Sequence, residues 1–196
     1  MKKYLNMNTL YIVAAIIAVS AFLLPRAIEA INLHVNGISH IAGQVDDYYK
    51  ISEPVDGEFT LELDLNDLAS NEGKILFDDG DSRISVKEVV EREEAGYEVI
   101  FRSHGVEQSN GAVLVSGVDH FRTETGLSQS IEAEAQADFS DGEAIELTPS
   151  SGSGLIYHDG DHFGFYLDTP AEGANKVKVT ISNLQLNLWI EKAIFQ

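Results

Sequence analysis

The sequence predicts an all-β protein, a single antiparallel β-sandwich of jelly-roll type that follows an N-terminal signal helix. Two observations predict the sandwich. Apolar residues recur at every second position through much of the chain, and turn-forming residues interrupt this alternation roughly every 8–16 residues. A third observation, one long apolar segment near the N-terminus, predicts the signal helix. We therefore assign residues 1–30 to a signal peptide and residues 31–196 to one acidic β domain.

The N-terminal segment has the three parts of a secretory signal. Lys2 and Lys3 supply positive charge, and residues 10–24 contain no charged side chain. Pro25 follows the apolar run, and Ala30 is the small residue that a leader peptidase requires before the bond it cuts. A signal needs about 7–15 apolar residues and a membrane-spanning helix about 20, so cleavage after Ala30 is the favoured interpretation. An uncleaved membrane anchor is the alternative.

Export predicts a secreted, periplasmic or cell-surface protein, which contacts a membrane only if the N-terminal segment is kept. Residues 31–196 hold 31 of the 32 acidic residues and 10 of the 13 basic ones, a net charge of −21. Such a charge disfavours nucleic acid and anionic membrane surfaces as partners. The chain has no cysteine, so neither a disulfide nor a thiolate metal site stabilises the fold.

Alternation predicts most strands directly. Residues 59–65 place four apolar side chains on one face and three polar side chains on the other. The same pattern predicts a strand over residues 31–36. Residues 176–190 form a longer segment in which Ser182 and Asn183 shift the phase, as a bulge or a tight bend would. Further strands are expected at residues 44–51, 83–90, 97–103, 112–122, 131–139 and 162–168.

Other local signals predict a helix, a loop and two turns. Residues 65–71 suit a helix of one or two turns, and residues 148–154, rich in Ser and Gly, are interpreted as a surface loop. Asp79-Gly80 and Asp159-Gly160 are each expected to form a two-residue hairpin turn, because Asp-Gly favours the type I′ turn.

Residues 158–162, His-Asp-Gly-Asp-His, are the densest group of possible metal ligands. Imidazole and carboxylate groups bind zinc, manganese or iron, which makes His158, Asp159 and Asp161 candidate ligands. The expected turn at Asp159-Gly160 argues against a shared ion, since it would direct His158 and His162 to opposite faces of the hairpin.

Asp78, Asp79 and Asp81 form a second candidate metal site. Calcium takes six to eight oxygen ligands and prefers carboxylates. The segment lacks the twelve-residue loop and the closing glutamate of an EF-hand. Calcium is the only cofactor that the sequence suggests.

Three further residues, Tyr157, His162 and Tyr166, are candidates for ligand binding. Aromatic rings stack on sugars, although cross-strand packing is the commoner use of such residues. The sequence has no P-loop, nucleophile elbow or His-Glu-x-x-His motif, so no catalytic residue is assigned.

These observations favour a non-enzymatic surface or secreted protein. It would be a structural or adhesive subunit, or a module that binds a saccharide or a protein. The alternating segments at 31–36 and 176–190 would suit self-association by strand addition. A secreted polysaccharide-active enzyme on a jelly-roll scaffold and a small outer-membrane β-barrel are the alternatives.

Overall fold

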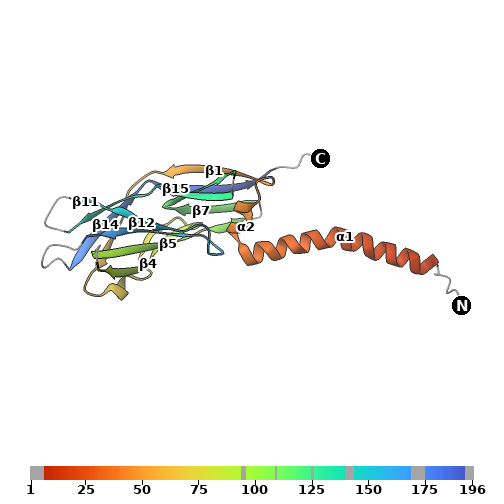
Figure 1. The fold of residues 1–196 in the computed structure, drawn as a ribbon, viewed down its shortest axis with the longest axis horizontal. Coiled ribbons are helices and arrows are strands. Elements are labelled where there is room, and N and C mark those ends of the chain that lie inside the picture. The colour runs from red at the N-terminus through yellow and green to blue at the C-terminus, as the bar shows by residue number, and fades with distance from the viewer. Residues whose placement is uncertain are drawn as a thin grey trace. The chain divides into compact units, whose positions relative to one another are not determined.

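The structure is a computed structural model that describes residues 7–93, 96–108, 110–124, 126–139, 144–168 and 175–192. The chain divides after Asn36 into two compact units. The first unit contains one long helix, and the second contains a short helix and all of the described strands (Figure 1).

Helix α1 (Met7–Asn36) makes up the described part of the first unit, and none of its residues is buried. Its most apolar window of 18 residues has a mean hydropathy of 2.2. By length and composition the helix could therefore cross a membrane, and a signal sequence has the same properties.

Helix α1 continues without a break through Ala30 to Asn36. The strand predicted for residues 31–36 is therefore wrong. Alternation over six residues is a short signal, and these residues extend a helix that already exists. Each residue added to a helix gains a backbone hydrogen bond without the cost of nucleation, so the helix continues.

The second unit begins at Gly37, whose φ of +54° separates α1 from α2 (Ile38–Gly43). Ile38 and Ile41 of α2 are buried in the second unit. The amide of Ile38 donates a hydrogen bond of 2.9 Å to the carbonyl oxygen of His158, which fixes α2 to a distant loop.

Among the described residues, the strands form four antiparallel sheets. Sheet A has the order β1 (Tyr48–Val55), β15 (Leu184–Glu191), β7 (Gly111–Ser116), β6 (Val106–Gln108). Sheet B has the order β11 (Ile145–Glu146), β10 (Glu134–Asp138), β14 (Lys176–Ser182), β2 (Phe59–Asp64). Sheet C has the order β12 (Thr148–Gly152), β13 (His162–Leu167), β5 (Gly96–His104), β4 (Arg83–Arg92), β3 (Ile75–Asp78). Sheet D pairs β8 (Val118–Thr123) with β9 (Gly126–Ile131).

The expected β-rich, antiparallel architecture is confirmed. Strands β2, β4, β5 and β13 begin and end within two residues of their predicted bounds. Strand β10 lies inside the segment predicted at 131–139, and its Ala135 and Ala137 are buried as the alternation indicated.

Residues 112–122 contain two strands, β7 and β8, with Gly117 between them. Strand β1 begins four residues later than predicted, because residues 44–48 form a turn in which the Tyr48 amide donates to the Gln44 carbonyl.

The phase shift predicted at Ser182 and Asn183 marks a change of sheet. Strand β14 ends at Ser182 in sheet B, and β15 begins at Leu184 in sheet A. Asn183, between them, has a φ of +54°, a conformation that Asn tolerates better than most residues. Its side-chain amide donates a hydrogen bond of 2.7 Å to the carbonyl oxygen of Glu132. The slip in the sequence pattern is thus a bend that takes the chain from one sheet to the other.

Two weaker predictions have different outcomes. The helix expected at 65–71 is present as a short 3₁₀ helix, η1 (Leu68–Asn71). The loop expected at 148–154 is wrong, because residues 148–152 form β12 and pair with the edge of β13. Pro149 and Gly152 disfavour strands by propensity, but an edge position tolerates both, since half of the backbone groups there need no partner.

One hydrophobic cluster of buried residues forms the core, with members from strands of all four sheets. Phe101 of β5 and Phe163 of β13 are fully buried and stack with their ring centroids 5.4 Å apart. Burial of such large rings contributes much of the hydrophobic stabilisation of a domain.

Candidate functional site

The turn in residues 157–160 lies one residue earlier than predicted. Tyr157 and Gly160 form an isolated antiparallel β-bridge, so the two residues between them, His158 and Asp159, form the turn. The reason lies in a neighbouring strand, because a Cβ on Gly160 would overlap the carbonyl oxygen of Ser103. Glycine is therefore required at position 160 for a close backbone approach rather than for the turn itself.

Asp159 contacts two side chains, those of Arg102 and His104, at the surface of sheet C. One carboxylate oxygen pairs with the guanidinium of Arg102, and the other lies 2.8 Å from Nδ1 of His104. Burial acts to raise the pKa of Asp159, but the hydrogen bond from His104 and the charge of Arg102 outweigh it, so the pKa is lowered. Arg102 also stacks over the ring of Tyr157, with Cζ 3.7 Å from the ring centroid.

The carboxylate of Asp161 has different partners from that of Asp159. Its side chain is fully buried, and Oδ2 lies 2.6 Å from Nε2 of His120. Its Oδ1 accepts a hydrogen bond of 2.8 Å from the hydroxyl of Ser116. His158 points elsewhere again, with Nε2 at 3.5 Å from a carboxylate oxygen of Glu107. The predicted ligands His158, Asp159 and Asp161 are therefore not brought together.

Two of the three aspartates of the second candidate metal site, Asp78 and Asp79, organise the loop around them with their side chains. Asp78 accepts hydrogen bonds from the amide of Gly80 (3.0 Å) and from Nε of Arg83 (2.8 Å). Together these bonds hold the pKa of Asp78 below its usual range. Asp79 accepts from the amides of Asp81 and Ser82 at 3.0 and 2.7 Å.

The hairpin around this loop also differs from the prediction. Strands β3 and β4 pair up to Asp78 and Arg83, so the loop has four residues, 79–82, rather than two. In the part of the chain that the structure describes, no group of three or more His, Asp or Glu side chains is placed to hold a metal ion.

The ligand-binding candidates are partly brought together. The rings of Tyr157 and His162 meet edge to face with centroids 6.0 Å apart. Tyr166 lies four residues further along β13, about 13 Å away at the rise of a strand. Burial and the positive charge of Lys87 lower the pKa of His162. Arg102 already covers one face of Tyr157.

A different site, which the sequence did not predict, is built around His120 on β8. His120 is fully buried, because its strand position faces inward between sheets A and C. Asn187 of β15 holds the strand in place. Its Oδ1 accepts from the amide of His120 at 3.0 Å, and its Nδ2 donates to the carbonyl oxygen of Val118 at 2.8 Å. The neighbouring Asp119 faces the opposite way and pairs with Lys50 of β1.

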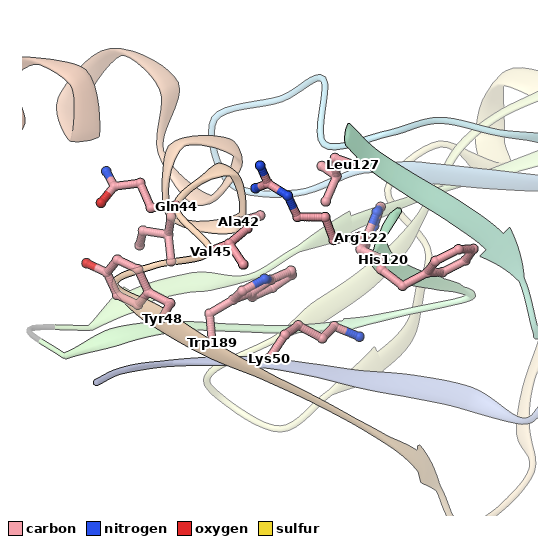
Figure 2. Close-up of a pocket in the computed structure, with 11 residues that line it drawn as sticks. Ala42, Gln44, Val45, Tyr48, Lys50, His120, Arg122, Leu127 and Trp189 are labelled. Atoms are coloured by element: carbon pink, nitrogen blue, oxygen red, sulfur yellow. The ribbon is translucent and has the colours of Figure 1, made fainter. Parts of the chain in front are cut away.

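Beside His120 lies a partly open cavity of about 100 Å³. Figure 2 shows side chains from α2, β1, β8, β9 and β15 around it. Trp189 of β15 forms part of the lining, with its ring centroid 6.4 Å from that of His120. The lining residues are Ile41, Ala42, Gln44, Val45, Tyr48, Lys50, His120, Phe121, Arg122, Leu127 and Trp189.

The charge of this cavity is opposite to that of the whole protein. The chain has 32 acidic and 13 basic residues, yet Lys50 and Arg122 line the cavity and no Asp or Glu does. Burial lowers the pKa of Lys50, and the hydrogen bond and charge of Asp119 only partly oppose this. The guanidinium of Arg122 donates to the carbonyl oxygen of Gly43 at 2.6 Å, which fixes it at the rim beside α2.

Sequence reasoning could have found only part of this site. The alternation of β8 places His120 on the same face as the apolar Val118, which is a signal that this histidine is buried. Its partner Asp161 is 41 residues away, just before β13, and nothing in the local pattern connects the two. In comparisons with known proteins, no family model, no curated protein and no solved structure matches the chain.

Proposed function

We propose that this chain is an envelope protein that α1 anchors in a membrane, with the acidic β domain displayed on the outer side as a non-enzymatic binding or structural module. The observation that carries the proposal is the length of the uncharged segment. Positions 4–25, between Lys3 and Arg26, are 22 residues without a charged side chain. As a helix they would span about 33 Å, close to the roughly 30 Å of a bilayer core.

Two features favour a retained anchor over cleavage. Residues 7–36 are one helix in which no residue is buried. The expected cleavage position, Ala30, lies inside this helix, whereas a peptidase must bind its substrate in an extended form. Lys2 and Lys3 precede the segment, which by the positive-inside tendency leaves the N-terminus in the cytoplasm and the β domain outside.

The non-enzymatic part of the proposal is supported by the hydrogen bonds of the buried polar residues. A serine nucleophile needs a histidine that takes its proton. Here both the hydroxyl of Ser116 and Nε2 of His120 bond to Asp161, so the histidine does not contact the serine. Asp161 itself is fully buried and occupied by these two partners.

We also propose that the β domain is one jelly-roll-like sandwich. The support is the single core cluster, which draws on strands of all four sheets. A single cooperative unfolding transition, followed by circular dichroism and by Trp189 fluorescence, is expected. Two separated transitions would contradict one shared core.

The anchor is tested by expressing the full chain in a bacterial host and separating membranes from soluble protein. We expect an uncleaved chain of 21.5 kDa that stays in the membrane pellet after a carbonate wash. Protease added outside spheroplasts should digest the β domain. Ile16→Lys, in the middle of the apolar segment, should release or misdirect the chain, and Ile16→Leu is the matched control.

Two results would overturn this proposal. A soluble product that begins at Ile31 would show that the segment is a cleaved signal. A membrane-bound chain whose β domain resists external protease would show that the domain faces the cytoplasm.

A further inference from the structure

We propose that the cavity between α2, β8 and β15 binds the carboxylate group of a small organic acid. The proposal rests on the binding role proposed above and names the class of ligand. Its main argument is the chemistry of the lining, which includes Lys50, His120 and Arg122 and no Asp or Glu side chain.

The first observation is an unpartnered atom. His120 is fully buried and its Nε2 faces Asp161, which does not line the cavity. Its other ring nitrogen, Nδ1, is buried and has no hydrogen-bond partner within the described parts of the chain. Because buried polar atoms are nearly always paired, this nitrogen, on a residue beside the cavity, would gain a partner from a ligand that displaces the contacts now covering it.

The second observation is the set of charged donors. Lys50 and Arg122 line the same cavity from β1 and β8 (Figure 2). The bond from Arg122 to Gly43 accounts for one of the five N–H donors of a guanidinium, and that from Lys50 to Asp119 for one of three on an ammonium. A carboxylate accepts from such groups through two oxygens, and these charge-assisted bonds are the stronger kind.

The third observation is size. A cavity of about 100 Å³ has room for about three water molecules at roughly 30 Å³ each, or for a carboxylate with a few further heavy atoms. Its apolar lining, which includes Val45, Leu127 and Trp189, suits a short carbon chain or one edge of a ring. Both a free short-chain acid and the acidic end group of a saccharide satisfy this chemistry.

A carboxylate at Nδ1 would place His120 between two carboxylates, since Asp161 already faces Nε2. The other titratable and charged groups that line the site are Tyr48 and Lys50 of β1 and Arg122 of β8. Asp119 is next to the site through its contact with Lys50, and His40 of α2 through its contact with Gln44. A metal ion is disfavoured, because His120 has no second ligand there and two cations are close.

The chain provides its own reporter for the test. Trp189 is the only tryptophan, so fluorescence of the full chain in detergent, excited selectively at tryptophan, reports on this cavity. The probes are propionate and D-glucuronate, with D-glucose as the neutral analogue and sodium chloride at matched ionic strength. We expect a saturable change with at least one carboxylate and none with D-glucose or chloride.

Variants then locate the site. Arg122→Gln should weaken carboxylate binding by at least about tenfold, as expected for loss of a charged hydrogen bond. Arg122→Lys keeps the charge and should retain most of the affinity. Lys176→Gln makes the same charge change on sheet B, where Lys176 is exposed beside Glu62, and should have no effect.

Each other outcome overturns the proposal. Equal responses to D-glucose and D-glucuronate would identify a site for neutral hydroxyl compounds. No response to any carboxylate beyond that of chloride would mean that the cavity holds only water. Equal affinities of the Arg122→Gln and Lys176→Gln variants would place binding elsewhere. Because the assay uses solubilised protein, a failure here leaves the membrane result of the fractionation experiment unaffected.

Discussion

His120 and Asp161 are joined by a 2.6 Å contact between two fully buried side chains that lie 41 residues apart in the sequence. The contact connects β8 of sheet D to the segment that enters β13 of sheet C. Ser116 of β7 extends it, because its hydroxyl donates to Asp161 and lies 3.1 Å from the hydroxyl of Ser103. A chain of polar groups thus connects three sheets inside an apolar core.

We expect this pair to be a major contributor to stability. Asp161→Ala would leave Nε2 of His120 and the Ser116 hydroxyl buried without a partner, at a cost of about 3–5 kcal/mol. Asp159→Ala, two residues away, removes a partly exposed ion pair and should cost only about 1 kcal/mol or less. Urea unfolding measures both. Equal losses of unfolding free energy in the two variants would show that the buried pair contributes no more to stability than the exposed ion pair.

Asn187 should be almost as sensitive. Its amide satisfies the backbone N–H of His120 and the carbonyl of Val118, and all of these groups are buried. Asn187→Ala leaves two backbone groups unpaired and is expected to cost about 2–4 kcal/mol. Thr180→Ala, at the solvent-facing Thr60–Thr180 contact, is the control and should change the free energy of unfolding by less than about 1 kcal/mol. A near-neutral Asn187→Ala would mean that water replaces the amide.

The two glycines that flank α2 should respond in opposite ways. Gly37 has a φ of +54°, and a Cβ there would overlap the carbonyl oxygen of His158, so Gly37→Ala should destabilise the β domain by at least about 1–3 kcal/mol. Gly43 has nothing within 4 Å of its added Cβ, and Gly43→Ala should be neutral or stabilising by up to about 1 kcal/mol. Thermal unfolding of both variants tests the difference. Similar shifts in melting temperature would be incompatible with the packing of α2 on residue 158.

His162 should make the protein less stable in mild acid. Because its pKa is lower in the folded protein than in the unfolded chain, the unfolded chain binds the proton more readily. The stabilisation is complete above the unfolded value of about 6.5 and decreases as the pH falls below it. His162→Gln removes this contribution, so the wild-type chain should lose more stability than the variant between pH 7.5 and pH 5. Parallel losses measured by urea unfolding would contradict the assignment.

The sequence predicted the strands where the alternation was long and one face was buried. Residues 59–65, 83–90 and 97–103 are strands within two residues of expectation, and the slip at Asn183 is a real bend. The sequence pattern gave a wrong prediction in two places, one where a short alternation followed a helix and one where the decisive contact was distant. Residues 31–36 joined a preceding helix, and residues 148–152 became a strand because the edge of β13 was open.

The candidate sites show the same difference between local properties, which the sequence reveals, and tertiary contacts, which it does not. The pattern could identify His158, Asp159 and Asp161 as chemically capable residues, but it could not assign their partners. Asp159 contacts Arg102 and His104, whereas Asp161 is buried and contacts His120. The reason is geometric, since residues two positions apart can reach different layers once a turn lies between them.

By itself, therefore, the sequence determined the class of this protein: an apolar N-terminal helix followed by an acidic, cysteine-free, antiparallel β domain. Charge, hydropathy and the period of the apolar alternation are properties of short segments, so they can be read directly from the sequence. Only the tertiary structure decided that His120 meets Asp161 and that Lys50, Arg122 and Trp189 share one cavity. These contacts join residues from different sheets, and their formation depends on how the sheets pack rather than on any local preference of the chain.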